Sequence, residues 1–516
     1  MYAPKARSLL PFIGWPYAAL VLVASGTAAG YGWRRLNLPF QLDYGEGAIL
    51  WQVMNLFDRH RAYVALGAGR EVVWNYPPVY LAVVRLFSPL SRDLLWAGRL
   101  VSWISALGIA ALLCGIIYIS FPRRFGYALR IAASSTGLLY LCADPVLYWI
   151  PFMRIDVLGL FLTYLGLFLF ISSRAVNPWK VYLAFFCFFL AVWTKQNFLA
   201  APFVSLLITF SLALRRALRL CAVYGLASVL AFLLAMRWTS GGFALNLITY
   251  NLHAFSLHRA IAGLSENIIE VRLFFILCGA LLMAALLRIS KALAKVGRAK
   301  WAARLRHSRF FFSFAVLTLH FAVAFVISFG YGKNGSNVNY FLEWTAALVA
   351  LSGLAVGLLF REMQRAPRLT LAILTAVIFV FFVPFQMLAR TKKAMHPLPQ
   401  FEMEMDQERE AYERMIPLIK NTPGPVLSDD MVLLVFAGKD LLYEPATMLF
   451  LEQKGRWSPS DFERRIESHE FPFIITTSTQ FWVPGITDAI NSNYMPDLVI
   501  GKYQLYKPRQ AFGAPH

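Results

Sequence analysis

The sequence predicts an α-helical protein that crosses a membrane many times and carries a small soluble α/β domain after the last span. Three observations predict this fold class: the composition, the recurrence of long apolar runs, and the placement of basic residues between those runs. Of the 516 residues, 58% are hydrophobic and 15% are charged, whereas about a quarter of the residues in soluble domains are charged. The composition therefore excludes an ordinary soluble chain.

Apolar runs recur from Leu9 to Leu388 and predict a bundle of about eleven transmembrane helices, because a helix of about twenty apolar residues crosses the hydrocarbon of a bilayer. The expected spans are residues 10–32, 94–120, 128–150, 157–173, 179–193, 197–214, 219–236, 264–287, 310–330, 340–360 and 369–389. The five cysteines all fall inside these spans without CxxC spacing. We therefore expect buried thiols, not a disulfide framework or a zinc site.

The placement of basic residues predicts the orientation of the chain. If the N-terminus is cytoplasmic, the inside loops carry the Lys and Arg residues, including the run at 288–309, and Glu362 is the only acid in them. The positive-inside rule then places the C-terminal domain on the outer side of the membrane, which is periplasmic or extracellular in a bacterial plasma membrane and lumenal in the endoplasmic reticulum. On this interpretation the net charge of +21 mostly reflects basic residues in the inside loops that set the orientation of the chain. We therefore expect membrane lipids as partners and no nucleic acid.

The first outer loop, residues 33–93, is too apolar to be a simple linker. Its segments 45–57 and 77–90 have an amphipathic helical periodicity, which predicts two interfacial helices that lie along the membrane surface. Aromatic side chains favour the headgroup level of a bilayer. The residues expected there are Trp51, Trp74 and Tyr76.

Residues 1–395 are expected to form the membrane domain and residues 396–516 the soluble α/β domain. The stretches GPVLSDD and FPFIITTS predict strands, MVLLVFAG and SPSDFERRIE predict helices, and DLVIGKYQLYKP predicts a terminal hairpin. No motif marks Asp429, Asp430 or Trp482, so we expect them to be ordinary exposed surface residues.

Two carboxylates follow the first span in the stretch NLPFQLDYGEGAILWQ, namely Asp43 and Glu46. The spacing is that of a helix N-cap with its partner three residues later. At the outer membrane face, the same carboxylate also suits a general base toward an acceptor hydroxyl. Glu46 would then orient the acceptor or hold a divalent cation together with Asp43. Capping and catalysis are compatible, and the spacing alone does not separate them.

Other polar residues gather in the outer loops. Arg154 has the planar fork that grips a phosphate, or it forms an interfacial ion pair with Asp156. Lys195 lies between two apolar runs and should face a polar cavity or a bound anion, unless it snorkels to the surface.

The stretch GYGKNGSNVNY is a glycine-rich loop without a Walker A pattern. Its backbone amides suit a phosphate oxygen, although a plain flexible connection gives the same composition. His253 and His258 lie five residues apart, a spacing that does not favour a metal pair on one helical face.

The order of these motifs resembles that of a known family. DYGEG after the first span, then NYPPVYLAVV, RIDVLGLFL, TKQ and NVNYFLE, with a soluble domain at the outer end, resembles the bacterial polyprenyl-phosphate-sugar-dependent glycosyltransferases of the GT-C fold. Relatives include the protein O-mannosyltransferases and the aminoarabinose transferases that modify lipid A. The chain departs from eukaryotic protein mannosyltransferases, which carry adjacent Asp and Glu residues, because Tyr44 and Gly45 separate its two acids.

The resemblance implies an inverting transfer of a sugar from a polyprenyl-phosphate donor to an envelope acceptor, either a glycan, a lipid or a protein hydroxyl. Asp43 would be the general base, with Glu46 as the second catalytic residue. The expected donor-phosphate ligands are Arg154, Lys195, Lys333, Asn337, Asn339 and Tyr340. The expected substrate-binding residues are Tyr76, Asp156, Gln196, His253, His258, Arg259 and Glu343.

Other functions fit parts of this pattern. A lipid or glycolipid transporter or flippase is the main alternative from another class, although no inverted repeat is visible in the sequence. A scaffold for an envelope complex would need no acids at the membrane face. A ligase that uses a pyrophosphate-linked donor would share many of these features. No organic cofactor is expected, and a divalent metal remains an open alternative.

Overall fold

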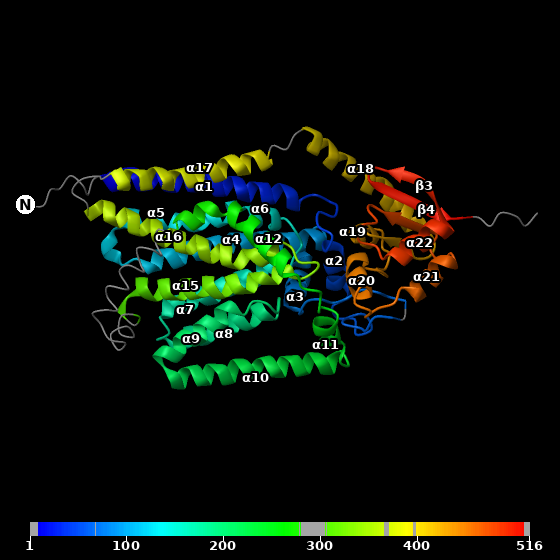
Figure 1. The fold of residues 1–516 in the computed structure, drawn as a ribbon, viewed down its shortest axis with the longest axis horizontal. Helices are drawn as coiled ribbons and strands as arrows, with labels where there is room; N and C mark the ends of the chain where they lie inside the picture. The colour runs from blue at the N-terminus through cyan, green and yellow to red at the C-terminus, as the bar shows by residue number, and fades with distance from the viewer. Residues whose placement is uncertain are drawn as a thin grey trace, which may run out of the picture.

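The computed structural model describes residues 9–67, 69–277, 279, 305, 307–365, 371–395 and 399–509. These residues form an elongated helical bundle with a small α/β unit at one end, opposite the start of the first helix (Figure 1). Most of the predicted basic run at 288–309 lies outside the described residues.

Long apolar helices build the bundle. They are α1 (Leu9–Leu36), α4 (Leu94–Ser120), α7 (Asp156–Ser173), α8 (Pro178–Val192), α9 (Ala200–Leu212), α10 (Leu214–Trp238), α15 (Arg309–Ser328), α16 (Leu342–Arg365) and α17 (Leu371–Met395). Within the described part of the chain, six helical segments are long and apolar enough to cross a membrane. The multi-pass architecture is therefore confirmed, whereas the predicted number of about eleven spans stays a prediction.

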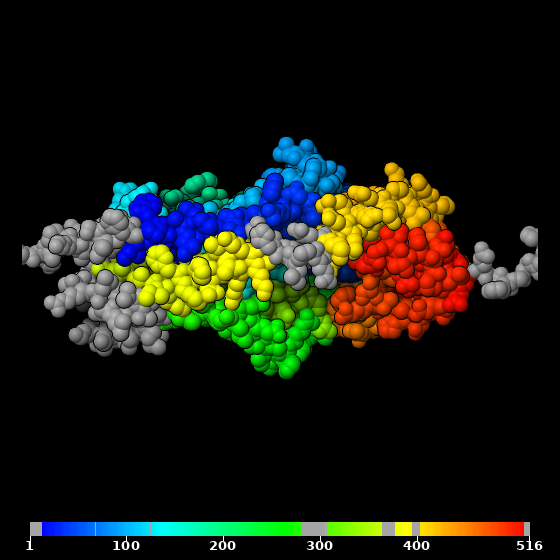
Figure 2. Space-filling view, turned by 90° about the horizontal axis from the view of Figure 1, so that it is seen from above, coloured from blue at the N-terminus to red at the C-terminus, as the bar shows by residue number. Residues whose placement is uncertain are grey.

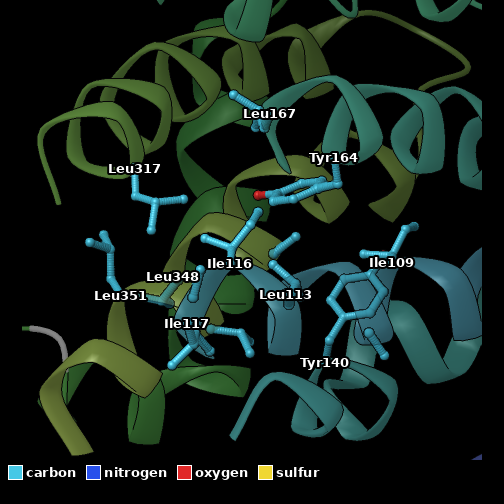
Figure 3. Packing of buried hydrophobic residues seen from close by; sticks show 14 of the residues in the cluster. Ile109, Leu113, Ile116, Ile117, Tyr140, Tyr164, Leu167, Leu317, Leu348 and Leu351 are labelled. Atoms are coloured by element: carbon cyan, nitrogen blue, oxygen red, sulfur yellow. The ribbon is translucent and has the colours of Figure 1, made fainter. Parts of the chain in front are cut away.

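The core of the bundle is a layer of aliphatic and aromatic side chains between α4, α7, α15 and α16. Ile116 of α4, Tyr164 of α7 and Leu348 of α16 meet there (Figure 3). Helices in lipid associate through such close packing, because the hydrophobic effect gives no net drive between them. A Cβ at Gly137 would lie 2.6 Å from the backbone nitrogen of Cys114, so only glycine permits this approach to α4.

The predicted span 128–150 is not one continuous helix, because the structure breaks it into three pieces. They are α5 (Tyr127–Ser135), a 3₁₀ helix (Thr136–Cys142) and α6 (Asp144–Trp149). Ala143 has an extended backbone between the last two. Pro145 lies in the first turn of α6, where a missing amide donor costs little.

Shorter helical elements lie between the long helices along the chain. They are α2 (Glu46–Asn55), α3 (Val79–Phe87) with a 3₁₀ turn (Ser88–Leu90), α11 (Gly242–Ala244) with a π-helical turn (Leu245–Thr249), α12 (Leu257–Glu270), and the 3₁₀ turns Arg123–Phe125, Phe329–Gly332 and Val338–Phe341. The two helices predicted in the first outer loop are therefore present, as α2 and α3.

Two of the aromatic residues predicted at headgroup level are buried instead. Trp51 is 2% exposed and Trp74 is 1% exposed. The reason is that α19 (Met431–Phe436) covers α2, so closely that a Cβ at Gly47 would lie 2.4 Å from the Met431 Cβ. Sequence periodicity did not reveal this second covering surface.

The C-terminal unit contains the predicted strands, helices and hairpin and occupies one end of the molecular surface (Figure 2). Its elements are α18 (Pro399–Asn421), β1 (Val426–Ser428), α19, α20 (Pro445–Glu452), α21 (Ser460–Glu467), β2 (Phe473–Thr476), α22 (Pro484–Asn493), β3 (Tyr494–Ile500) and β4 (Tyr503–Pro508). The sheet order is β1-β2-β4-β3, with β1 and β2 parallel and the other pairs antiparallel. Leu427 pairs with Ile474, and Ile475 with Leu505.

The prediction that Asp429, Asp430 and Trp482 are exposed is wrong. Asp430 is 1% exposed, and its carboxylate accepts hydrogen bonds from the Tyr412 and Tyr503 hydroxyls at 2.7 and 2.8 Å. Asp429 accepts from the Thr477 amide at 2.8 Å, and Trp482 is 3% exposed against Tyr443. These acids are buried because the β1–α19 turn is covered by neighbouring elements.

The first outer loop and the C-terminal unit share one hydrophobic core. Trp51 and Tyr80 from the loop belong to the same buried cluster as Met431 and Leu505 from the unit. Their backbones also join at Glu71, whose amide donates to the Leu442 carbonyl at 2.7 Å and whose carbonyl accepts from the Glu444 amide at 3.0 Å. The proposed boundary between residues 395 and 396 therefore separates chain segments that pack together in three dimensions.

Candidate active site

A cavity of about 630 Å³ lies at the junction of the helical bundle and the C-terminal unit. Its walls come from the first outer loop, from the loops that connect bundle helices, and from the segment around α20. The predicted site residues that line it are Asp43, Tyr76, Arg154, Lys195, Gln196, His253, Arg259, Lys333, Asn337, Asn339 and Tyr340. The structure thus brings together polar residues that lie up to three hundred residues apart, as Asp43 and Tyr340 do.

Asp43 and Arg154 form an ion pair in the cavity wall. The Arg154 Nε lies 3.2 Å from the Asp43 Oδ1, and the two side chains are 15% and 11% exposed. A Cβ at Gly45 would lie 1.6 Å from the Arg154 Nη1, so the glycine makes room for the guanidinium. Burial raises the pKa of the Asp43 carboxyl, and Arg154 offsets part of that rise. Asp43 is therefore a partly buried carboxylate that still faces open volume.

Asp43 is not the side-chain cap of α2. Helix α2 begins at Glu46 with Gly45 in the cap position, and no side chain caps its amides. The Asp43 Oδ1 accepts instead from the Gly45 amide at 3.1 Å. Only the reciprocal half of a capping box is present, because the Glu46 Oε2 accepts from the Asp43 amide at 3.2 Å.

Glu46 lies outside the cavity, and the structure corrects the expectation that it acts on substrate or holds a cation. It is fully buried with Arg99, whose Nε and Nη2 lie 2.8 and 2.6 Å from its two oxygens. The amides of Met153 and Leu42 donate to the same carboxylate at 2.8 and 2.7 Å. Burial alone would raise the pKa of Glu46, but Arg99 and these amides hold it below its usual value. Both oxygens are occupied, so Glu46 fixes the loop that carries Asp43.

Lys195 points to Asp156, which lies beneath the cavity wall. The Lys195 Nζ and the Asp156 Oδ1 are 2.5 Å apart, and Asn339 Nδ2 donates to the same oxygen at 2.9 Å. The Trp149 Nε1 donates to the other oxygen at 3.1 Å. Lys195 is 6% exposed and its Nζ lies 4.9 Å from the Tyr340 ring centroid. Lys195 therefore does not snorkel, and Asp156 positions cavity residues without lining the cavity itself.

A second set of cations lies on the loop side of the cavity. Lys333 follows the 3₁₀ turn at 329–332, and the Asn334 amide donates to the Ala254 carbonyl at 2.9 Å. The Arg259 Nη2 donates to the Ser336 carbonyl at 2.8 Å. Among the described residues, neither Lys333 nor Arg259 has a carboxylate within ion-pair distance. Burial and the nearby lysines lower the pKa of His253 to about 4, so this histidine is neutral at pH 7.

Besides Asp156, two further predicted substrate-binding residues do not line the cavity. His258 is exposed at the start of α12 and does not line the cavity, whereas Arg259 turns toward the loop at 333–337. Glu343 lies in the first turn of α16 and faces the bundle interior, where its Oε1 is 3.7 Å from the buried His320 Nε2. Proximity in sequence to Arg259 and Tyr340 suggested both residues, but helical geometry turns them away.

The sequence did not reveal the cavity wall formed by the C-terminal unit. Its members include Glu444, Thr447, Phe450, Gln453 and Phe481. The Ala446 amide donates to the Tyr44 hydroxyl at 2.8 Å, which ties this wall to the residue beside Asp43. No motif surrounds Glu444, so only the packing of the two segments identifies it. Within the part of the chain that the structure describes, no group of three His, Cys, Asp or Glu side chains is arranged to hold a metal ion.

Comparison with solved structures identifies the fold, whereas comparison of sequences identifies no family. No family model and no curated protein matches the chain. A crystal structure of ArnT from Cupriavidus metallidurans bound to undecaprenyl phosphate is similar over 98% of this chain and 99% of its own, with a TM-score of 0.55 and 14% identity. The apo form of the same protein gives the same TM-score and identity over 96% of this chain.

An archaeal oligosaccharyltransferase is also similar. AglB from Archaeoglobus fulgidus, in complex with an inhibitory peptide and a dolichol-phosphate, has a TM-score of 0.52 and 13% identity. The match covers 96% of this chain and 74% of AglB. At this level of identity the likeness concerns the fold, and it confirms the predicted GT-C architecture.

Proposed function

We propose that this chain is a membrane glycosyltransferase that moves a sugar from a polyprenyl-phosphate donor to an acceptor hydroxyl, with inversion and with Asp43 as the general base. One observation carries the proposal: the Asp43 carboxylate and cations from three separate loops line a single cavity at the end of the bundle. The fold supports it, because two proteins of similar fold are described in complex with undecaprenyl phosphate and with a dolichol-phosphate.

Asp43 takes the proton of the acceptor hydroxyl as the hydroxyl oxygen attacks the anomeric carbon. The bond between that carbon and the phosphate oxygen breaks on the opposite face, and its electron pair leaves with the phosphate. The raised pKa of Asp43 makes its ionised form a better proton acceptor. Arg154, at 3.2 Å, holds the carboxylate in one orientation.

The departing phosphate needs positive charge that is not already neutralised. The pairs Asp43–Arg154 and Lys195–Asp156 are each internally neutral. Lys333 and Arg259 supply the additional charge, together with donors from Asn337 and Asn339. Such donors stabilise developing charge most strongly when they are held in place before the reaction. Pairing of the loops at 251–256 and 333–336 holds these residues in place.

The location of the cavity suits a lipid-borne donor. Apolar helices form one side of the junction and the C-terminal unit forms the other (Figure 1). In this proposal the N-terminus is cytoplasmic, and the cavity and residues 396–516 lie on the outer side of a bacterial plasma membrane. The polyprenyl chain lies in the bilayer, and the acceptor is an envelope glycan, lipid or protein hydroxyl.

The test is sugar transfer by purified protein in lipid, with a panel of radiolabelled polyprenyl-phosphate sugars and an envelope extract as acceptor. We expect transfer by wild type and a loss of about 10²–10⁴-fold in folded Asp43→Asn, because that is the usual contribution of a general base. Asparagine keeps the oxygen that accepts from Gly45. Equal transfer by both proteins would refute Asp43 as the base. Absence of transfer with every donor would favour a transporter instead.

A further inference from the structure

Glu444 is a second carboxyl in the cavity wall, and it comes from the C-terminal unit. It is 6% exposed and lines the same cavity as Asp43. Its position is fixed by the backbone, because the Glu444 amide donates to the Glu71 carbonyl at 3.0 Å. Tyr44 lies between the two acids, since it follows Asp43 in sequence and its hydroxyl accepts from Ala446. The first outer loop and the C-terminal unit therefore each contribute one carboxyl to the cavity wall.

The usual structural roles of a buried glutamate do not account for Glu444. It occupies the position before α20, yet its side chain does not cap that helix. Among the described residues no cation lies within ion-pair distance of it, and Arg154 acts on it only from farther away. Its carboxylate accepts a hydrogen bond from the Thr447 hydroxyl and a long one, at 3.4 Å, from the Val73 amide. A buried carboxyl with so few partners retains unused capacity to accept hydrogen bonds.

The groups that face Glu444 come from three segments. Tyr44 and the Val73 amide belong to the first outer loop, Arg154 precedes α7, and the Thr447 hydroxyl belongs to α20. Arg154 is the one charged side chain among them, and it is already paired with Asp43. Glu444 is therefore free to bind a ligand group without first breaking an ion pair of its own.

We infer that Glu444 belongs to the acceptor subsite, where its carboxylate accepts a hydrogen bond from a hydroxyl of the acceptor other than the one that Asp43 deprotonates. The inference rests on the proposed function and deepens it. An acceptor held in this way carries at least two hydroxyl groups near each other, as a saccharide does. An isolated serine or threonine side chain offers only one hydroxyl, so the acceptor class is a glycan or glycolipid.

The protonation state of Glu444 then controls acceptor binding. Burial raises its pKa to about 7. The ionised form is the better hydrogen-bond acceptor. Acceptor affinity should therefore improve as the pH rises from 6 to 8, while donor binding should not follow the same change.

The experiment measures transfer kinetics of wild type, Glu444→Gln and Glu71→Gln with one active donor and a purified oligosaccharide acceptor, from pH 6 to pH 8. Glu71 is the matched control, because it joins the same backbone junction, is 4% exposed and has its pKa raised by burial to about 7, but does not line the cavity. Thermal unfolding in detergent verifies that each variant is folded.

We expect Glu444→Gln to raise the acceptor KM about tenfold, as loss of a hydrogen bond to a charged group does, with a much smaller change in kcat or donor KM. The pH dependence of kcat/KM for the acceptor should flatten in this variant and persist in Glu71→Gln. An unchanged acceptor KM in Glu444→Gln, or the same change in Glu71→Gln, would overturn the inference while transfer by wild type still supports the proposed function. A wild type that transfers no sugar would overturn both.

Discussion

Two acid–arginine pairs begin three residues apart in the first outer loop, yet the structure gives them different surroundings. Glu46 and Arg99 are both fully buried, and five hydrogen bonds from Arg99 and the backbone occupy the carboxylate. Asp43 and Arg154 share a single 3.2 Å contact and line the cavity. Both pairs join a carboxylate to a guanidinium, so the difference lies in the additional hydrogen bonds that each carboxylate accepts.

The number of hydrogen bonds that a carboxylate accepts, more than its burial, therefore distinguishes the structural Glu46 from Asp43, the proposed base. Both acids are mostly buried. The Arg99 charge and the hydrogen bonds hold the pKa of Glu46 below its usual value, whereas burial leaves the pKa of Asp43 raised despite Arg154. A group with a raised pKa and an open side is suited to proton transfer.

The largest effect is expected from Arg99→Met. Removal of one partner strands the Glu46 charge in the interior, which costs about 3–5 kcal/mol of stability. Thermal unfolding in detergent should show a large loss, and the double variant Arg99→Met with Glu46→Leu should recover part of it. If Arg99→Met were as stable as wild type, the Arg99–Glu46 pair would have no structural role.

Arg154→Met should preserve the fold better and lower transfer by about 100-fold, a typical loss for one preorganised charged group in an active site. Arg154 lowers the pKa of Asp43, so its removal should move the acid limb of the pH–rate profile to higher pH. The base acts in its ionised form, and for this reason activity falls as the pH drops through its pKa. An unshifted limb would mean that another group controls the profile.

Lys333→Gln should raise the donor KM by about three- to tenfold, because an exposed cation contributes modestly to phosphate binding. The effect should shrink at high salt. Lys420→Gln is the control, since Lys420 is exposed at the end of α18 and does not line the cavity. Equal effects of the two substitutions would indicate general surface charge instead of a phosphate contact.

The smallest effect is expected from His258→Ala. His258 is exposed outside the cavity, and surface substitutions usually change the free energy by less than about 0.5 kcal/mol. Transfer rates should remain within about twofold of wild type. A tenfold loss would place His258 in the reaction and contradict the cavity described above.

Sequence patterns were sufficient for the parts of the fold that depend on local periodicity and composition. Long apolar runs identified α4 and α7, and the turn in DLVIGKYQLYKP identified the β3–β4 hairpin. The sequence did not predict the break in the helix at Ala143, because the apolar composition continues through it and only the backbone conformation changes. The burial of Trp51 was not predicted either, because the element that covers it, α19, lies nearly four hundred residues later in the chain.

In the candidate site, too, the sequence predicted residues with a local pattern and missed those that depend on packing between distant segments. Asp43, Arg154 and Lys195 stood out in sequence because charged residues between apolar runs are costly without a purpose. The partner of Glu46 could not be predicted, since Arg99 lies inside a span with no local motif around it. No sequence pattern predicted that Glu444 lines the cavity, because its position depends on the contact between two segments that are distant in sequence.

The shared core between the first loop and the C-terminal unit has a consequence for biosynthesis. Asp43 and Lys333 are made before the wall that contains Glu444 and Phe481. A ribosome-bound chain that stops at residue 440 therefore carries the proposed base and the cavity cations without the wall that completes the cavity. If the proposed function holds, sugar transfer should begin only after the last segment has been made and has packed against the first loop.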